Sequence, residues 1–183
     1  MGGLLSGADI SDLCGLVTFR LSGMELALPV GAVREVAPVA RLDRSPHMPN
    51  IVEGVLNLAG EAVAVLRLDH LLALEPGVFG LDASILLMRG GARPLGLLVE
   101  HVDGVRPLTD FSTMGSPPDQ SFNGCLAADL EYSGRIIHLL SWPNLLLAEE
   151  RDRLADFQSR EQARLDQLGS GDGPIHADRE LRR

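Results

Sequence analysis

Residues 51–66, with the sequence IVEGVLNLAGEAVAVL, indicate the class of fold. Two runs rich in aliphatic residues, Val52–Leu58 and Ala62–Leu66, flank the short turn Ala59–Glu61. Apolar runs of this length around a glycine-containing turn are typical of a β-hairpin. The stretch therefore predicts a β-rich fold with tight connections.

Glycine and proline divide much of the chain into similar short apolar pieces. Three further strand pairs are predicted: Leu16–Leu21 with Met24–Val30, Ile85–Met88 with Leu95–Val99, and Cys125–Leu130 with Arg135–Leu140. Ala32–Val36 fits either a short helical turn or the start of a strand, and Asp69–Leu74 predicts a short helix. The pattern favours a fold that is mainly all-β.

The strand pattern contains an internal repeat. Val52–Leu58 and Phe122–Ala128 each open a hairpin that is followed by a pair of leucines, at an offset of about 70 to 74 residues. Each half holds about five short strands, which is enough to close a small barrel. We therefore expect two related β halves, with residues 75–77 and 108–121 between them and the second of these segments as an exposed loop.

The C-terminal segment differs in composition from the rest of the chain. Ser141 suits a helix N-cap, and Pro143 suits a first helical turn. Residues 148–168 consist mainly of good helix formers and predict one helix with a thin apolar face. That face fits either a mostly solvated terminal helix or a helix that docks on a partner or self-associates. We expect residues 1–15 to be flexible and residues 169–183 to be disordered.

The charge pattern excludes several classes of function. The net charge is −9, and all 16 basic residues are arginines. A chain without lysine has no Schiff-base or P-loop lysine, and an acidic chain repels nucleic acid. Two cysteines make no disulfide framework, and no apolar run reaches the roughly 18 residues of a membrane span. The sequence predicts a cytoplasmic protein that neither binds nucleic acid nor inserts into a membrane.

No catalytic or metal-binding pattern stands out in the sequence. We find no nucleophile elbow, zinc-binding histidine pair or phosphate-binding glycine loop, and the five histidines are scattered singly. His138, between Ile137 and Leu139, is predicted to be structural. We therefore predict a binding protein that is not an enzyme and that uses no cofactor and no metal.

Several short motifs follow one another in a specific order. They are LALPV (residues 26–30), VREV (33–36), Met48-Pro49, IVEGVLNLAG (51–60), LGLLV (95–99) and RIIHLL (135–140). In this order and at these spacings they resemble the CheW-like chemotaxis adaptor domain, over about residues 16–147. The resemblance implies two small five-stranded SH3-like β-barrels packed together and a closing C-terminal α-helix.

The resemblance also implies a non-catalytic adaptor of chemosensory signal transduction. Such scaffolds join the cytoplasmic tip of chemoreceptors to the regulatory domain of a histidine autokinase, in arrays at the inner face of the membrane. The partner-binding positions that the resemblance carries over are Val33, Glu35, Gly54, Leu58, Ala59, Val99 and Val102. The competing interpretation is structural: core packing for Leu58 and the valines, a solvated charge for Glu35, and tight backbone geometry for Gly54.

Three features depart from the family pattern. Ala59 stands where the family has an arginine, and the family's Asp-Leu-Arg is replaced by Arg67-Leu68-Asp69, which can keep a local ion pair of reversed polarity. The C-terminal helix and tail extend past the usual end. Two alternatives stay open: a scaffold of a chemosensory pathway other than motility, and a divergent β-barrel that binds a small ligand or second messenger.

Overall fold

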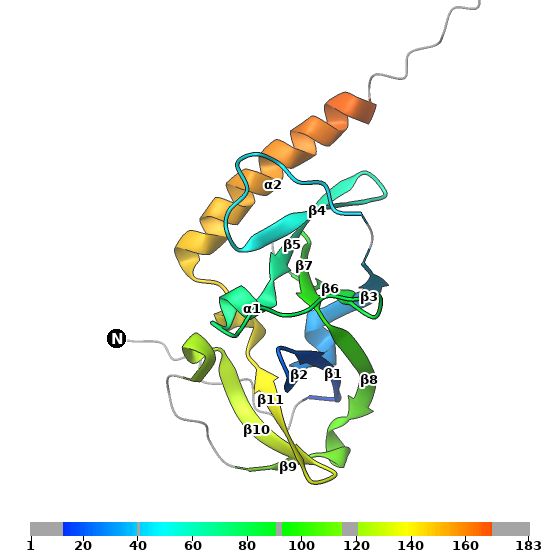
Figure 1. The fold of residues 1–183 in the computed structure, drawn as a ribbon, viewed down its shortest axis with the longest axis vertical. Helices are drawn as coiled ribbons and strands as arrows, with labels where there is room; N and C mark the ends of the chain where they lie inside the picture. The colour runs from blue at the N-terminus through cyan, green and yellow to red at the C-terminus, as the bar shows by residue number, and fades with distance from the viewer. Residues whose placement is uncertain (1–12, 40, 91–92, 115–120, 170–183) are drawn as a thin grey trace, which may run out of the picture.

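The fold consists of two β-sheets and a long C-terminal helix, in a computed structural model that describes residues 13–39, 41–90, 93–114 and 121–169 (Figure 1). The first sheet has the strand order β8 (His101–Pro107), β1 (Gly15–Leu21), β2 (Met24–Pro29), β11 (Arg135–Leu140), β10 (Leu126–Tyr132) and β9 (Ser112–Thr113). The second has the order β3 (Val33–Pro38), β6 (Ser84–Met88), β7 (Leu95–Val99), β5 (Glu61–Arg67) and β4 (Val52–Leu58). The mainly all-β class and the four predicted strand pairs are confirmed. The expectation of five strands in each barrel misses the two-residue strand β9.

The two sheets share one topology. Strands β3, β6, β7, β5 and β4 correspond to β8, β1, β2, β11 and β10. In both series the successive pairs are antiparallel, antiparallel, parallel and antiparallel. The internal repeat in the sequence therefore corresponds to a repeated sheet.

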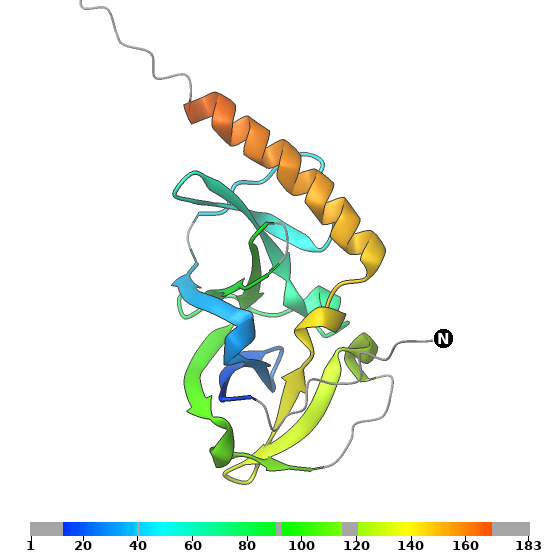
Figure 2. The same ribbon diagram turned by 180° about the vertical axis from the view of Figure 1, so that it is seen from behind.

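The two sheets are not consecutive halves of the chain, and this corrects the order expected from the sequence. The N-terminal hairpin β1–β2 inserts between β8 and β11, so the first sheet combines both ends of the fold. Figures 1 and 2 show this dark blue hairpin beside the green and yellow strands. Its contact with β11 is parallel, with Leu26 opposite His138. Of the expected dividing segment 108–121, residues 115–120 lie outside the described residues.

Buried apolar side chains form three clusters. One cluster belongs to the first sheet and includes Leu130 and Ile137, and another belongs to the second sheet and includes Val63 and Leu87. The largest cluster takes side chains from both sheets, among them the fully buried Phe19. Because each fully buried large apolar side chain contributes roughly 1.5 to 3 kcal/mol, this shared cluster packs the two sheets into one unit.

The helices differ in detail from the prediction. Helix α1 (Leu68–Leu71) is shorter than the expected Asp69–Leu74, because Ala73 has a φ of 53° and cannot continue a right-handed helix. Both alternatives for the segment before β3 occur in succession, since a 3₁₀ turn at Val30–Ala32 leads into the strand.

Helix α2 (Ala148–Gly169) lies along the second sheet, where Figure 2 shows it in orange. Its side chains Leu154 and Phe157 are buried, and its main contact is with β5. The thin apolar face therefore docks within the chain, while the opposite face stays exposed. Within the described part of the chain, no helix is long and apolar enough to cross a membrane. The expected disordered tail and most of the expected flexible N-terminus fall outside the described residues.

Three hairpins turn through the same two-residue conformation. The residues at these turns all have positive φ values: Ser22-Gly23 (52° and 75°), Ala59-Gly60 (52° and 91°) and Ser133-Gly134 (51° and 77°). Two successive positive φ values are the mark of a type I′ turn, whose twist matches that of the flanking strands. A left-handed alanine costs roughly 1 kcal/mol, so Ala59 is the least suitable of these residues for its position.

Replacing Ala59 with asparagine is expected to stabilise the protein by about 0.5 to 1 kcal/mol, because asparagine adopts the left-handed conformation more readily. The midpoint of thermal unfolding should rise by about 2 to 4 °C. Ala59→Val should lower the midpoint, since a β-branched residue is disfavoured in this conformation. Equal midpoints for all three proteins would show that the turn is not strained at this residue.

Candidate functional site

Four of the seven expected binding positions lie where the chain crosses between the sheets: Val33, Glu35, Val99 and Val102. Val33 is 6% exposed and Val99 is fully buried, and Val102 packs half-buried against the same apolar cluster. Glu35 is exposed on β3 and pairs with Arg34 at 3.2 Å. An exposed pair of this kind contributes little to stability. Val33 and Val99 therefore belong to the core, Val102 packs against it, and Glu35 is exposed at the surface.

Gly54 is buried in β4 for a structural reason. A Cβ atom at this position would lie 2.7 Å from the Leu42 Cβ and 3.1 Å from the Asp43 carbonyl oxygen. The missing side chain lets the preceding loop lie directly on the strand, where Asp43 and Val55 exchange two backbone hydrogen bonds of 2.9 Å. The absence of a side chain at Gly54 therefore allows this close approach of the loop to the strand.

The remaining surface positions do not form one continuous patch. Leu58 is half-buried at the end of β4, and Ala59 is exposed at the following turn. Strands β3 and β4 are opposite edges of the second sheet, so Glu35 and Ala59 belong to different edges of the strand order. Glu35 beside the crossover and Ala59 at the β4–β5 turn are therefore two separate surface positions.

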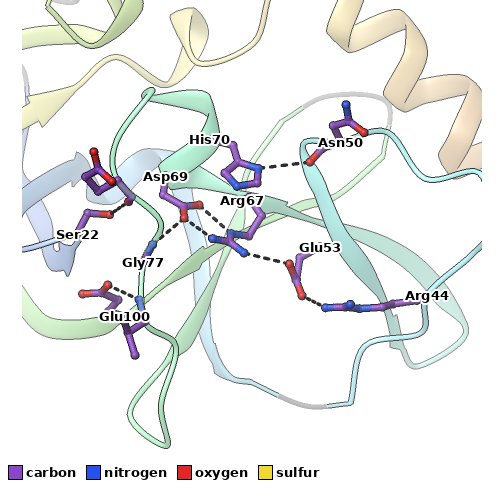
Figure 3. Close-up of polar contacts among 11 residues, drawn as sticks. Ser22, Arg44, Asn50, Glu53, Arg67, Asp69, His70, Gly77 and Glu100 are labelled. Carbon is purple, nitrogen blue, oxygen red and sulfur yellow. Dashed lines mark hydrogen bonds and ion pairs between the residues drawn. The ribbon is translucent and has the colours of Figure 1, made fainter.

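A charged cluster lies at the junction of β5 and α1 (Figure 3). Arg67 Nε donates to Asp69 Oδ1 at 2.9 Å and a second guanidinium nitrogen donates to Oδ2, while the side chain of Asp69 is fully buried. Arg67 also reaches Glu53 on β4 at 3.5 Å, and Glu53 pairs in turn with Arg44. The local pair predicted from the reversed triplet is confirmed, and the structure extends it to a second strand and a loop.

The loop after α1 is held by two hydrogen bonds near its start and carries exposed apolar side chains. The Gly77 N–H donates to Asp69 Oδ2 at 2.9 Å, and the Val78 N–H donates to Glu100 Oε1 at 2.8 Å (Figure 3). The side chains of Val78 and Leu81 are nevertheless 82% and 105% exposed. The sequence-based expectations covered only residues 75–77 of this segment and included neither Val78 nor Leu81. Exposed apolar side chains that lie together can mark an interaction surface. Here the loop that carries them is held in place by hydrogen bonds.

Opposing effects set the ionisation of the central pair. Burial raises the pKa of Asp69, but hydrogen bonds from Arg67 and the Gly77 N–H outweigh it and hold the pKa at about 2. The hydrogen bond to Asp69 raises the pKa of Arg67, against the effect of burial. Both groups are therefore charged at neutral pH, as a bidentate pair requires.

Acid should remove the stabilisation that this pair provides. The pKa of Asp69 is lower in the folded chain than the ordinary value of 3.8. Its contribution of about 2 kcal/mol is therefore complete above about pH 4 and is lost as the pH falls toward 2. Asp69→Asn should lack this part of the pH dependence, measured as the free energy of unfolding in denaturant from neutral pH to about pH 2.5. The same acid dependence in both proteins would contradict the assignment.

Histidine and acidic side chains make structural contacts rather than a metal centre in the described ranges. There, no group of three or more His, Cys, Asp and Glu side chains is placed to hold a metal ion. His138 Nδ1 lies 2.6 Å from Asp129 Oδ1 on the neighbouring strand, and its ring meets the Phe122 ring edge-on at 5.3 Å. These contacts agree with the structural role predicted for His138.

The fold defines a class of protein: a domain of two related β-sheets that share one core. A family model described as the CheW-like domain matches residues 15–150. The chain therefore belongs to the CheW-like family.

Two chemotaxis proteins resemble the chain in sequence, and a solved structure resembles it in fold. "Chemotaxis protein CheW" of Rhizobium meliloti is 27% identical over 143 residues, which cover 75% of this chain and 90% of that protein. "Probable chemotaxis protein CheW" of Rhizobium etli is 27% identical over 102 residues, which cover 56% of this chain and 66% of that protein. The crystal structure of scaffolding protein TtCheW from Thermoanaerobacter tengcongensis has a TM-score of 0.65 at 18% identity, covering 82% of this chain and 96% of that one. This last match shows the same fold, with two SH3-like barrel subdomains.

Proposed function

We propose that this chain is a non-catalytic adaptor that couples the cytoplasmic tip of a chemoreceptor to the regulatory domain of a histidine autokinase. The observation that carries the proposal is the family match over residues 15–150, which spans both sheets. The names of the relatives, chemotaxis proteins, and the scaffold title of the solved structure support a role in assembly rather than catalysis.

The repeated architecture suits a protein with two partners. Strands β3 and β8 occupy equivalent edge positions in the two sheets. Each carries an exposed valine, Val36 at 44% and Val105 at 64%. Exposed strand edges supply unpaired backbone groups beside apolar side chains, a common basis for protein recognition. These edges offer binding areas in addition to the β4–β5 turn, and a standard interface buries roughly 800 Å² on each partner.

The β4–β5 turn is the area that we assign to the receptor. Ala59 is exposed there, at the place where the resemblance implies an arginine. Alanine offers no charge and no bidentate donor, so this turn favours a receptor surface that lacks a matching carboxylate. That chemistry supports the alternative of a chemosensory pathway other than motility. The small-ligand alternative stays a prediction, which a thermal-shift screen tests.

The two equivalent turns allow a matched experiment on receptor coupling. Kinase autophosphorylation is measured with receptor-containing membranes and this protein, and we expect the protein to change the rate of autophosphorylation.

Ala59→Arg should change receptor affinity several-fold, because it adds a charge at the assigned contact. Ser133→Arg places the same residue in the same type of turn in the other sheet and should leave receptor affinity unchanged. No effect of the parent protein on the kinase would contradict the proposed function.

A further inference from the structure

Strand β5 has a stretch of open edge at its start. Its neighbour β7 pairs with it only from Ala64 onward, where Ala64 lies opposite Leu95. The backbone groups of Gly60 and Ala62 lie before that point, and helix α2 covers them instead. Helix α2 therefore supplies hydrogen bonds to the chain just before the point where its described pairing with β7 begins.

A single side-chain amide makes this cover. Gln162 Oε1 accepts a hydrogen bond from the Ala62 N–H at 2.9 Å, and Gln162 Nε2 donates to the Gly60 carbonyl oxygen at 2.9 Å. The same Nε2 donates to Asp166 Oδ1 at 2.9 Å, one helical turn further on. Because a carboxylate only accepts hydrogen bonds, this contact fixes which end of the amide is nitrogen. The amide thus pairs with the strand as a peptide group of a neighbouring strand would.

Other residues of helix α2 also contact the second sheet and its adjoining segments. Gln158, four residues earlier and 4% exposed, donates from Nε2 to the Pro94 carbonyl oxygen at 2.8 Å. Residues four apart lie on one face of a helix, so both glutamines point to the sheet. Phe157 and Leu154 are buried beside them. Apolar packing of Leu154 and Phe157 therefore docks the helix, and Gln158 adds a separate contact away from the β4–β5 turn.

The turn that Gln162 holds is the one that carries Ala59. Gly60 also donates its N–H to Asn57 Oδ1 at 2.8 Å, so the turn is fixed from its own strand and from the helix. Ala59 has a φ of 52°, a conformation that alanine does not favour by itself. External hydrogen bonds are what keeps a strained turn in one conformation.

We infer that Gln162 is a positioning residue for partner binding: helix α2 holds the β4–β5 turn in its binding conformation through this amide. The inference rests on the proposed function, in which the turn meets the receptor. It makes the long C-terminal helix part of the binding apparatus, although the helix does not itself contact the partner. Without the Gln162 amide the turn samples other conformations. The fraction of molecules whose turn has the receptor-binding conformation then falls.

The test compares two single variants of the full chain. Gln162→Ala should weaken receptor binding about tenfold, the effect expected for losing one to two hydrogen bonds that order a contact. Gln158→Ala removes one hydrogen bond of the same helix to the sheet, away from the turn, and should leave receptor affinity within about twofold. Equal losses of affinity in both variants would reduce Gln162 to a docking contact and overturn the inference. Unchanged affinity in both would overturn it as well.

A second pair of variants separates positioning from stability. Asparagine at position 59 prefers the turn conformation, so Gln162→Ala should reduce affinity less in an Ala59→Asn background than in the parent background. Hydrogen exchange of the Ala62 amide should accelerate about tenfold in Gln162→Ala and stay unchanged in Gln158→Ala. An equal loss of affinity in both backgrounds would contradict the positioning role.

Failure of the proposed function has a different signature. If the parent chain binds no receptor surface at all, the adaptor assignment is wrong. The exchange rate of the Ala62 amide then decides alone whether the helix holds the turn, and unchanged exchange in Gln162→Ala would reject the clamp itself.

Discussion

Arg67→Ala is expected to lower the free energy of unfolding by about 3 kcal/mol at neutral pH, because it leaves a buried carboxylate without its partner. The side chain of Asp69 is fully buried and takes its guanidinium bonds from this one arginine. The substitution also removes the contact that ties Glu53 to the cluster. Denaturant unfolding at pH 7 measures the loss.

The pH dependence of this variant provides its control. Without Arg67, burial still raises the pKa of Asp69 and the lowering effect of the guanidinium is lost, so the pKa should lie well above its parent value of about 2. A raised carboxyl pKa destabilises the folded state above that pKa, so acidification should reduce the difference between variant and parent. The double variant Arg67→Met with Asp69→Asn, which buries no charge, should recover much of the loss. A single variant as stable as the parent at pH 7 would show that the cluster is not a structural centre.

Phe157→Ala is expected to cost about 3 kcal/mol, because it empties a site that packs helix α2 onto the second sheet. Phe157 is 5% exposed, whereas Leu168 on the same helix is 68% exposed and serves as the control. Leu168→Ala should change the free energy of unfolding by no more than about 0.5 kcal/mol. Circular dichroism and Trp142 fluorescence should report one coincident transition if the helix belongs to the cooperative unit. Equal effects of the two substitutions would mean that the helix is not docked in solution.

The local part of the fold could be predicted from the sequence because its signals are local. Each two-residue turn carries glycine at its second position. These glycines allowed three of the four hairpins to be predicted as antiparallel strand pairs. The insertion of β1–β2 between β8 and β11 could not be predicted, because it depends on a parallel pairing between residues far apart in the chain. Turn residues give no information about this long-range pairing, which forms only when the core of the whole domain packs.

In the candidate site too, contacts between residues close in the sequence could be predicted and long-range contacts could not. The reversed order of Arg67 and Asp69 predicted their pairing, since the two charges are only two residues apart in the chain. The contribution of Gln162 could not be predicted, because its partners Gly60 and Ala62 lie about a hundred residues away and offer only backbone atoms. Burial likewise had to be seen in three dimensions: the pattern around Val33 and Val99 suits a core and a contact surface equally well.

The central claim is that this chain is an adaptor for a histidine autokinase. It is tested most directly by mixing the full chain with the adaptor-like regulatory domain of a kinase from the same organism, and by measuring the mass with size-exclusion chromatography and light scattering. The account predicts a stable or rapidly exchanging complex, seen as a mass above that of either protein. Two folded proteins that elute at their separate masses, at concentrations of tens of micromolar or more, would contradict it.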